Sequence, residues 1–410
     1  GILKYFEECG GAHYDGECFV FDQRVALDPK LLETETAQCF ACQHPLSPEE
    51  QRSALYVEGT SCPHCYVDDE AARQARIEQR NHALVAHLLV LPGSTPADNE
   101  RPLHIGGAHD GRSIGEVLET VHPHVEDWAQ RVRDGRIRRR GEALAWDSVV
   151  RAGDVVVHVE PNVIEPDVSR DVRVIYEDDW IVAIDKPTPL PMHPSGRFNR
   201  NTLESFLRPL YAPKRLRPAH RLDANTSGLV VFSTSRRIAG LLQPQFEAGT
   251  VDKQYLVEVE GHPNASQWDC TAPIGRAVGS AGRRRTAPDG DKAKTAFTVL
   301  ERRSSTTLLV AQPFTGRTNQ IRIHAAESGH PVVGDAPYGK SPDSPMTRAP
   351  SDPAMHLHAW RLAVDHPATG ARLQLVTDAP AWVGQLTLAG KSFGTTKKRA
   401  RSTESSHSEI

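Results

Sequence analysis

Short apolar runs rich in β-branched residues recur between residues 170 and 390, and they constrain the fold more than any other feature of the chain. Turns containing Gly or Pro separate these runs, and helical stretches such as residues 238–248 interrupt them. Short strands with tight connections are typical of antiparallel pairing. We therefore expect an α+β domain over residues 170–390, built on a mixed, mainly antiparallel sheet. The expected strands cover residues 172–176, 180–184, 229–232, 255–259, 295–300 and 307–311.

The rest of the chain divides into smaller units. A length of 410 residues suggests two or three domains. Residues 1–95 form a first unit, in which residues 68–91 have a helical pattern and residues 92–96 (Pro-Gly-Ser-Thr-Pro) are a linker. Residues 102–165 form a second unit, and residues 394–410, rich in basic residues and Ser, are expected to be disordered. Because the chain begins without Met, in a helix-like phrase, we expect it to be a fragment or a trimmed form of a longer protein.

Seven cysteines and the absence of a secretory signal pattern indicate a reducing, cytoplasmic environment. No apolar run is long enough to span a bilayer, so no membrane partner is expected. Two Cys-x-x-Cys knuckles lie 19 residues apart, a spacing close to that of zinc ribbons. A structural zinc ion is therefore expected on Cys39, Cys42, Cys62 and Cys65; the alternative is a set of thiols without metal. We interpret Cys9 and Cys18 as packed thiols and His64 as facing solvent.

The unit at residues 102–165 combines helical pieces with a basic turn and strand. Ser113 is placed to cap a helix, which Pro123 should break. Arginines follow at 131, 133, 136 and 138–140, interleaved with Gly turns, and a Gly-Asp-Val strand begins at Gly153. The pattern resembles the alpha-L type RNA-binding motif of small ribosomal proteins. Such a row of guanidiniums suits phosphate contact, although a solvated charge run is the alternative.

The stretch His-Arg-Leu-Asp-Ala-Asn-Thr-Ser-Gly-Leu at residues 220–229 is the strongest candidate for a chemical site. It places Asp223 between Arg221 and a Thr-Ser-Gly turn, at the mouth of an apolar strand. An aspartate in such a place is suited to chemistry. Taken alone, however, the motif favours a carboxylate that caps a turn, because a short motif is only a hypothesis.

Three further segments accompany this motif in a fixed order. Residues 175–196 contain Asp-Lys-Pro and end in Met-His-Pro-Ser-Gly, residues 253–257 read Lys-Gln-Tyr-Leu-Val, and residues 314–324 read Phe-Thr-Gly-Arg-Thr-Asn-Gln-Ile-Arg-Ile-His. The last is followed by Gly-Asp-Ala-Pro-Tyr-Gly at residues 334–339. Together the four segments closely resemble the RluA family of RNA pseudouridine synthases. The resemblance implies the pseudouridine synthase fold and an isomerase that detaches uracil at N1 and rejoins it through C5.

The resemblance also implies roles for four residues. Asp223 matches the nucleophile, Arg221 the arginine that fills the space left by the flipped base, and Tyr255 the aromatic that stacks on the uracil. Arg322 matches the basic partner that keeps the aspartate ionised. Ile321 and Ile323 alternate around Arg322, which predicts that Arg322 lies on one face of a strand. Two positions depart from the family pattern: Asn319 stands where His is usual, and Pro189 where Gly is usual.

Residues 11–25 and the two knuckles resemble the C-terminal region of rhodanese-related tRNA uridine hydroxylases. The rhodanese catalytic loop would precede Gly1, so we expect no sulfurtransferase activity. The sequence contains no dinucleotide or P-loop motif, and an isomerisation needs no cofactor. We expect a monomer that acts on tRNA or rRNA. The alternatives are a catalytically idle RNA-binding protein and a tRNA-modification accessory module centred on the zinc unit.

Overall fold

The computed structural model describes residues 18–20, 25–28, 30, 33–39, 41–58, 61–67, 69–277, 283–339, 341, 344, 346, 347 and 349–384. The positions of Cys9 and of the tail at 394–410 lie outside these residues, as does the side chain of Cys18. Among the helices formed by the described residues, none is long and apolar enough to cross a membrane.

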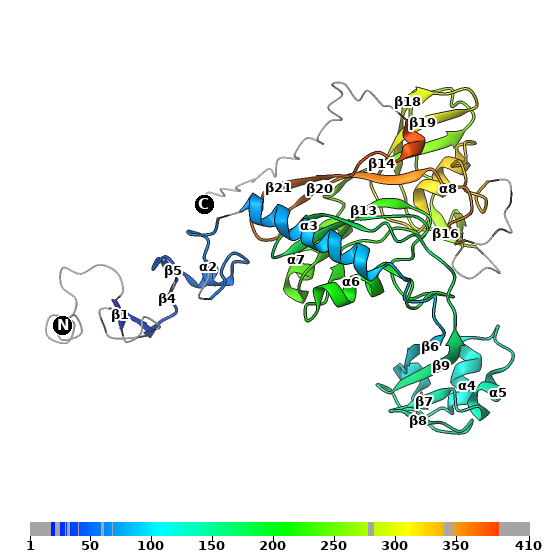
Figure 1. The fold of residues 1–410 in the computed structure, drawn as a ribbon, viewed down its shortest axis with the longest axis horizontal. Coiled ribbons are helices and arrows are strands. Elements are labelled where there is room, and N and C mark those ends of the chain that lie inside the picture. The colour runs from blue at the N-terminus through cyan, green and yellow to red at the C-terminus, as the bar shows by residue number, and fades with distance from the viewer. Residues whose placement is uncertain are drawn as a thin grey trace, which may run out of the picture.

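A mixed, mostly antiparallel sheet of ten strands dominates the structure (Figure 1), which confirms the expected α+β class. Its strand order is β10-β11-β13-β20-β14-β19-β18-β15, with β12 paired to β13 and β21 to β20. All its pairings are antiparallel except that of β13 with β20. The strands are β10 (Arg173–Glu177), β11 (Ile181–Lys186), β12 (Arg217–Pro218), β13 (Ser227–Ser233), β14 (Asp252–Glu260), β15 (Gln267–Cys270), β18 (Thr295–Arg302), β19 (Thr306–Pro313), β20 (Leu357–Asp365) and β21 (Arg372–Val376).

Strand β13 lies at the junction between the two halves of this sheet. It pairs along its whole length with β11 and, at its first two residues, runs parallel to β20. That approach requires Gly228, whose φ is +107° and where a Cβ would lie 2.2 Å from the carbonyl oxygen of Ala359. The glycine of the Thr-Ser-Gly turn is thus explained by backbone contact between strands. The same contact fixes the position of Asp223, five residues earlier.

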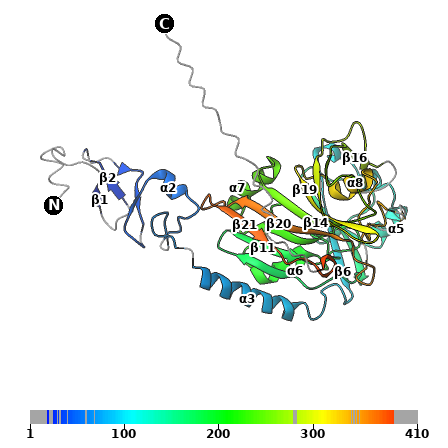
Figure 2. The same cartoon turned by 90° about the horizontal axis from the view of Figure 1, so that it is seen from above.

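Three helices contribute to the largest apolar core, beneath β10, β11 and β13. They are α6 (Leu203–Tyr211), α7 (Arg236–Glu247) and α3 (Glu70–His87). Helix α3 was expected within the N-terminal unit, but its buried Ile77 and Leu84 belong to the same apolar cluster as Ile181. Figure 2 shows α3 running along the outside of the large sheet. Its Asn81 side chain exchanges hydrogen bonds with the backbone of Val174 at 2.8 and 3.0 Å.

A second, four-stranded sheet of order β6-β9-β7-β8 forms with its own helices and its own core. Ser113 caps the first helix through a capping box, and the helix ends before Pro123, as the sequence predicts. The sequence also predicts the strand that follows Gly153. The elements are β6 (Ala97–His104), η1 (Gly107–His109), α4 (Ile114–Val121), α5 (Trp128–Arg133), β7 (Ile137–Arg139), β8 (Glu142–Ala143) and β9 (Val155–Val163).

The remaining described elements are short. The N-terminal part has small hairpins around the cysteines and one helical turn, and further short elements lie beside the large sheet. They are β1 (Cys18–Val20), β2 (Val25–Leu27), β3 (Glu33–Thr34), β4 (Ala37–Gln38), β5 (Pro45–Leu46), α2 (Pro48–Arg52), β16 (Ile274–Arg276), β17 (Arg284–Thr286), α8 (Gln320–Glu327) and η2 (Ala381–Val383).

Candidate active site

A cleft of about 740 Å³ opens between the loop before β13, the end of α7, β14 and the start of α8. The four residues singled out from the sequence, although distant along the chain, all line it: Arg221, Asp223, Tyr255 and Arg322. Arg221 is exposed, whereas Arg322 is fully buried and Asp223 is partly buried. The cleft is thus a concave, partly apolar site with a few convergent polar groups, as expected of a substrate site.

The loop between β12 and β13 holds Asp223 in a turn. The backbone N–H of Thr226 donates to the carbonyl of Asp223 at 3.0 Å, and that of Leu190 donates to the carbonyl of Ala224 at 2.9 Å. The carboxylate itself keeps 28% of its surface exposed, with one oxygen 3.6 Å from Arg322 Nη1. The turn is therefore formed by backbone groups, which leaves the Asp223 carboxylate directed to the cleft.

Lys186, at the end of β11, is a buried cation behind this loop that was not singled out from the sequence. Its ammonium donates to the carbonyls of Pro187 and Leu190 at 2.9 Å and of Ala224 at 3.3 Å. Burial lowers the pKa of Lys186 to about 7, and the nearby carboxylates of Asp223 and Asp185 oppose that shift. Lys186 therefore joins the segment after β11, at Pro187 and Leu190, to the nucleophile loop at Ala224.

Arg322 lies on helix α8, so the prediction that it lies on a strand was wrong. Every residue from Gln320 to Ala325 is buried, and a helix that is buried on all sides leaves no 3.6-residue pattern in the sequence. Over three residues, an Ile-Arg-Ile alternation does not distinguish a strand from a buried helix. Asn319, with φ of 58°, precedes the helix in the left-handed region.

The principal partner of Arg322 is Asp335, a residue for which no role was predicted. Arg322 Nε and Nη2 donate to the two carboxylate oxygens of Asp335 at 2.7 and 2.8 Å, and both side chains are essentially inaccessible. Arg322 Nη1 donates to Asn319 Oδ1 at 2.8 Å. Burial opposes the charge, but the bonds and charge of Asp335 raise the pKa of Arg322. Arg322 is therefore a fixed cation, clamped by Asp335 and facing Asp223.

Asn319, one of the two departures from the family pattern, belongs to this network. Its Nδ2 donates to the hydroxyl of Tyr338 at 2.9 Å, and the Tyr338 ring lies 4.8 Å from the Arg322 guanidinium carbon. An amide at position 319 serves both partners, because its oxygen accepts from Arg322 while its nitrogen donates to Tyr338. Asn319 thus joins Arg322 to Tyr338.

Tyr255 lies on β14, at a bulge in its pairing with β20. Burial, and secondly the negative charge of Asp223, raise the pKa of the Tyr255 phenol above its ordinary value. The phenol therefore stays protonated at neutral pH. Across the cleft, His220 stacks on Phe246 at 4.6 Å and accepts the N–H of Val231 at 3.2 Å. Burial lowers the pKa of His220 to about 3, so this histidine is a neutral packing residue.

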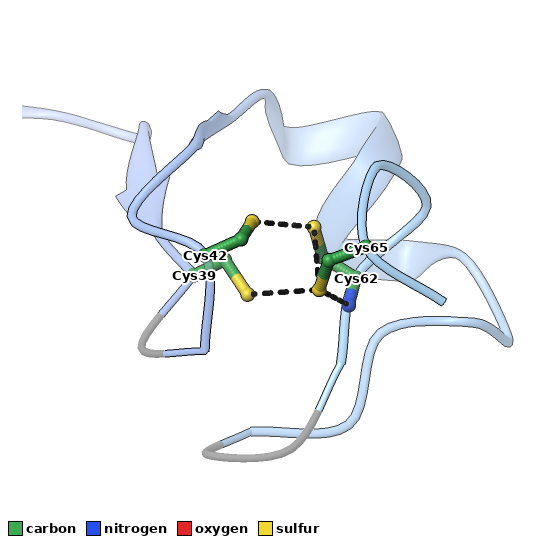
Figure 3. A group of neighbouring side chains, drawn as sticks. All are labelled: Cys39, Cys42, Cys62 and Cys65. Atoms are coloured by element: carbon green, nitrogen blue, oxygen red, sulfur yellow. Dashed lines mark hydrogen bonds between the residues drawn. The ribbon is translucent and has the colours of Figure 1, made fainter. Parts of the chain in front are cut away.

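The four expected zinc ligands form one cluster near the N-terminus (Figure 3). All four sulfurs lie within 4.8 Å of one another, and individual separations are 3.8 Å for Cys39–Cys65, 3.6 Å for Cys42–Cys62 and 3.7 Å for Cys62–Cys65. Sulfurs at the corners of a tetrahedron with zinc–sulfur distances of about 2.3 Å lie roughly 3.8 Å apart. The four cysteines can therefore hold a metal ion such as zinc. His64, expected to face solvent, is partly exposed and contacts Glu50 at 2.6 Å.

The basic row at residues 131–140 divides into two sets. Arg131 and Arg136 both bind Glu160, at 2.6 and 3.0 Å, and Arg139 binds Asp154 at 2.8 Å. These three guanidiniums join β9, or the turn before it, to neighbouring elements of the small sheet. The remaining three are exposed: Arg133, Arg138 and Arg140. These three exposed arginines are therefore the ones that a partner can contact.

Comparison of this chain with known proteins identifies the family to which it belongs. Residues 180–327 match the family model for RNA pseudouridylate synthase. An RNA pseudouridine synthase of Mycobacterium bovis is 36% identical over 217 residues, which cover 51% of this chain and 70% of that protein. The ribosomal large subunit pseudouridine synthase C of Vibrio cholerae is 33% identical, covering 60% of this chain and 79% of that protein. The solved structure of human RNA pseudouridylate synthase domain containing 1 aligns with a TM-score of 0.43 and 26% identity, over 54% of this chain and 86% of that chain. The chain belongs to the RNA pseudouridine synthase family of isomerases.

Proposed function

We propose that this protein isomerises specific uridines in structured RNA, either tRNA or rRNA, with Asp223 as the nucleophile. One observation carries the proposal: Asp223, Tyr255 and Arg322 come from three separate elements and line one cleft, with Asp223 facing the guanidinium of Arg322 at 3.6 Å. The guanidinium gives the carboxylate a fixed cationic neighbour in the cleft, and a carboxylate can attack electrophilic carbon as a nucleophile.

The reaction breaks the bond between ribose C1′ and uracil N1 and forms a bond between C1′ and C5. The hydrogen on C5 leaves as a proton, N1 gains one, and no electrons are exchanged. The Asp223 carboxylate attacks an electrophilic carbon, either ribose C1′ or uracil C6, and leaves again when the new glycosidic bond has formed. A partly buried, protonated Tyr255 is suited to stack on the uracil and to donate a hydrogen bond in the cleft.

A uridine in folded RNA must leave its stack before it reaches Asp223. We assign Arg221 to the space that the base vacates, because it is exposed at the rim of the cleft and lies two residues from the nucleophile. We assign Arg322 as the cation that faces the Asp223 carboxylate. Its clamp by Asp335 supports this role, since the guanidinium cannot swing away to solvent.

Two parts outside the catalytic sheet fit the same function. The exposed Arg133, Arg138 and Arg140 are suited to contact phosphates in a second RNA-binding module at residues 102–165. The four-cysteine cluster would hold a structural zinc ion in an N-terminal unit that resembles part of a tRNA-modifying enzyme. Zinc there would stabilise the local fold, and no step of the isomerisation passes through it.

The proposal is tested by mapping pseudouridine in total RNA after carbodiimide treatment. RNA from cells with the gene, without it, and with the Asp223→Asn variant is compared at single-nucleotide resolution. We expect one or a few uridines to be modified only where the wild-type protein is present. Identical maps from all three strains would contradict the function, and modification restored by Asp223→Asn would contradict the nucleophile.

A further inference from the structure

Phe314 is an exposed aromatic residue on the rim of the cleft that the mechanism above does not use. It follows the last residue of β19 and keeps 41% of its surface exposed. It lines the same cleft as Asp223 and Tyr255, yet it belongs to none of the apolar clusters that the described residues form. The exposure of this apolar ring at the rim of the cleft is therefore not explained by packing.

The backbone around Phe314 is held in place. Its N–H donates to the carbonyl of Lys294 at 2.9 Å. The next residue, Thr315, accepts from the N–H of Lys294 at 3.1 Å and donates to Gln320 at 2.7 Å. The carbonyl of Phe314 also lies against Gly249, where a Cβ would be 3.4 Å away. The ring is thus presented from a fixed loop, which reduces the entropy lost when it binds a partner.

Two basic side chains lie near this ring. The ammonium of Lys294 lies 5.2 Å from the ring centroid and binds Asp269 at 2.8 Å. Arg317, three residues further on, lines the cleft, keeps 43% of its side chain exposed and lies 3.8 Å from the exposed carboxylate of Asp291. Basic residues outnumber acidic ones in the cleft lining even when Arg322 is set against its buried partner Asp335: Arg221, Lys253 and Arg317 against Asp223 and Glu247. An aromatic platform in an electropositive groove is the arrangement that binds single-stranded nucleic acid.

We propose that Phe314 stacks on an unpaired base of the RNA next to the target uridine, and that Arg317 contacts the phosphate beside that base. The inference rests on the proposed function, because it places the target uridine at Asp223. Phe314 would then select for substrates in which the target lies in a loop or bulge, since a base in a helix is already stacked on its neighbours. It is a specificity residue and takes no part in bond making.

The test measures RNA binding, so it does not depend on turnover. A fluorescein-labelled pool of random-sequence single-stranded RNA is titrated with the full-length chain, and the Kd is read from fluorescence anisotropy. We expect Phe314→Ala to weaken binding by about tenfold. Phe314→Leu should remain weak because it keeps apolar area without an aromatic face, and Phe314→Trp should restore binding. Val376→Ala, at a residue that is 52% exposed and does not line the cleft, is the matched control.

The Phe314→Trp variant supplies a second readout. The fluorescence of its introduced tryptophan should be quenched when RNA binds, relative to the six native tryptophans measured in the wild type. Equal Kd values for wild type, Phe314→Ala and Phe314→Leu would overturn the inference, as would an introduced tryptophan that is not quenched or a wild type that does not bind the pool. Such results leave the pseudouridine maps unaffected, so failure of this inference and failure of the proposed function are distinguishable.

Discussion

Replacing Asp335 with Asn tests how the charge of Arg322 is shared between two carboxylates. In the wild type, Asp335 accepts two hydrogen bonds from Arg322 at 2.7 and 2.8 Å, whereas Asp223 lies 3.6 Å away. The Asn variant removes one negative charge and places an NH₂ group opposite a guanidinium N–H. Arg322 then has Asp223 as its remaining close anionic partner and should move toward it.

Two magnitudes follow from this geometry. Breaking a buried ion pair by removing one partner costs about 3–5 kcal/mol of the free energy of unfolding. At an effective dielectric constant of about 20, the attraction between Arg322 and Asp223 rises from roughly 4.6 kcal/mol at 3.6 Å to roughly 5.9 kcal/mol at about 2.8 Å. The difference of about 1.3 kcal/mol stabilises the resting carboxylate, so we expect its attack to slow by about tenfold.

Single-turnover release of tritium from RNA labelled at uracil C5 gives the rate, and urea unfolding gives the stability. Asp335→Glu keeps the charge and guards against loss of fold, and it should react within a few fold of wild type. Asp167→Asn, at an exposed aspartate, is the control for a change of charge. If Asp335→Asn is destabilised as expected but reacts at the wild-type rate, Arg322 does not slow the attack of Asp223 by moving toward it.

Two further predictions concern other parts of the chain. Protein purified without chelator should contain about one zinc per chain, and Cys62→Ser should lose that metal and melt earlier in its N-terminal part; wild type without metal would contradict the ribbon. Burial in the folded state lowers the pKa of His220 from the ordinary 6.5 to about 3. The free energy of unfolding therefore contains the full contribution of the neutral imidazole above pH 6.5 and loses it as the pH falls toward 3. Urea midpoints at pH 7 and 5 should therefore differ less in His220→Phe than in wild type, and equal differences would exclude His220 as a source of acid sensitivity.

The strands of the large sheet could be predicted where β-branched residues dominate. All six expected runs overlap strands of the structure, from β10 to β19, and residues 238–248 overlap α7. Strand β20 was missed, although it lies between β13 and β14. Its Leu-His-Ala-Trp-Arg sequence mixes polar and apolar residues because both His358 and Trp360 are buried, so no alternation marks it.

For the site, only residues that belong to the sequence motifs could be predicted. The four motifs identified the residues that line the cleft, but no spacing indicates that Asp335 clamps Arg322 or that Lys186 is buried behind Ala224. The sequence does not distinguish a buried lysine from an exposed one. Burial of Lys186 depends on three backbone carbonyls, one of which, that of Ala224, comes from a distant segment. The arginines at residues 131–140 were also only partly predictable. Three of the six form ion pairs with Glu160 or Asp154, which lie later in the chain.

The most direct test of the central claim separates binding from chemistry in the Asp223→Asn variant. Its Kd for total cellular RNA and its release of tritium from C5-labelled uridine are measured on the same preparation. We expect a Kd within about twofold of wild type and no tritium release, because the amide keeps the shape of the cleft but is not a nucleophile. Release at a rate close to that of wild type would contradict the assignment of Asp223.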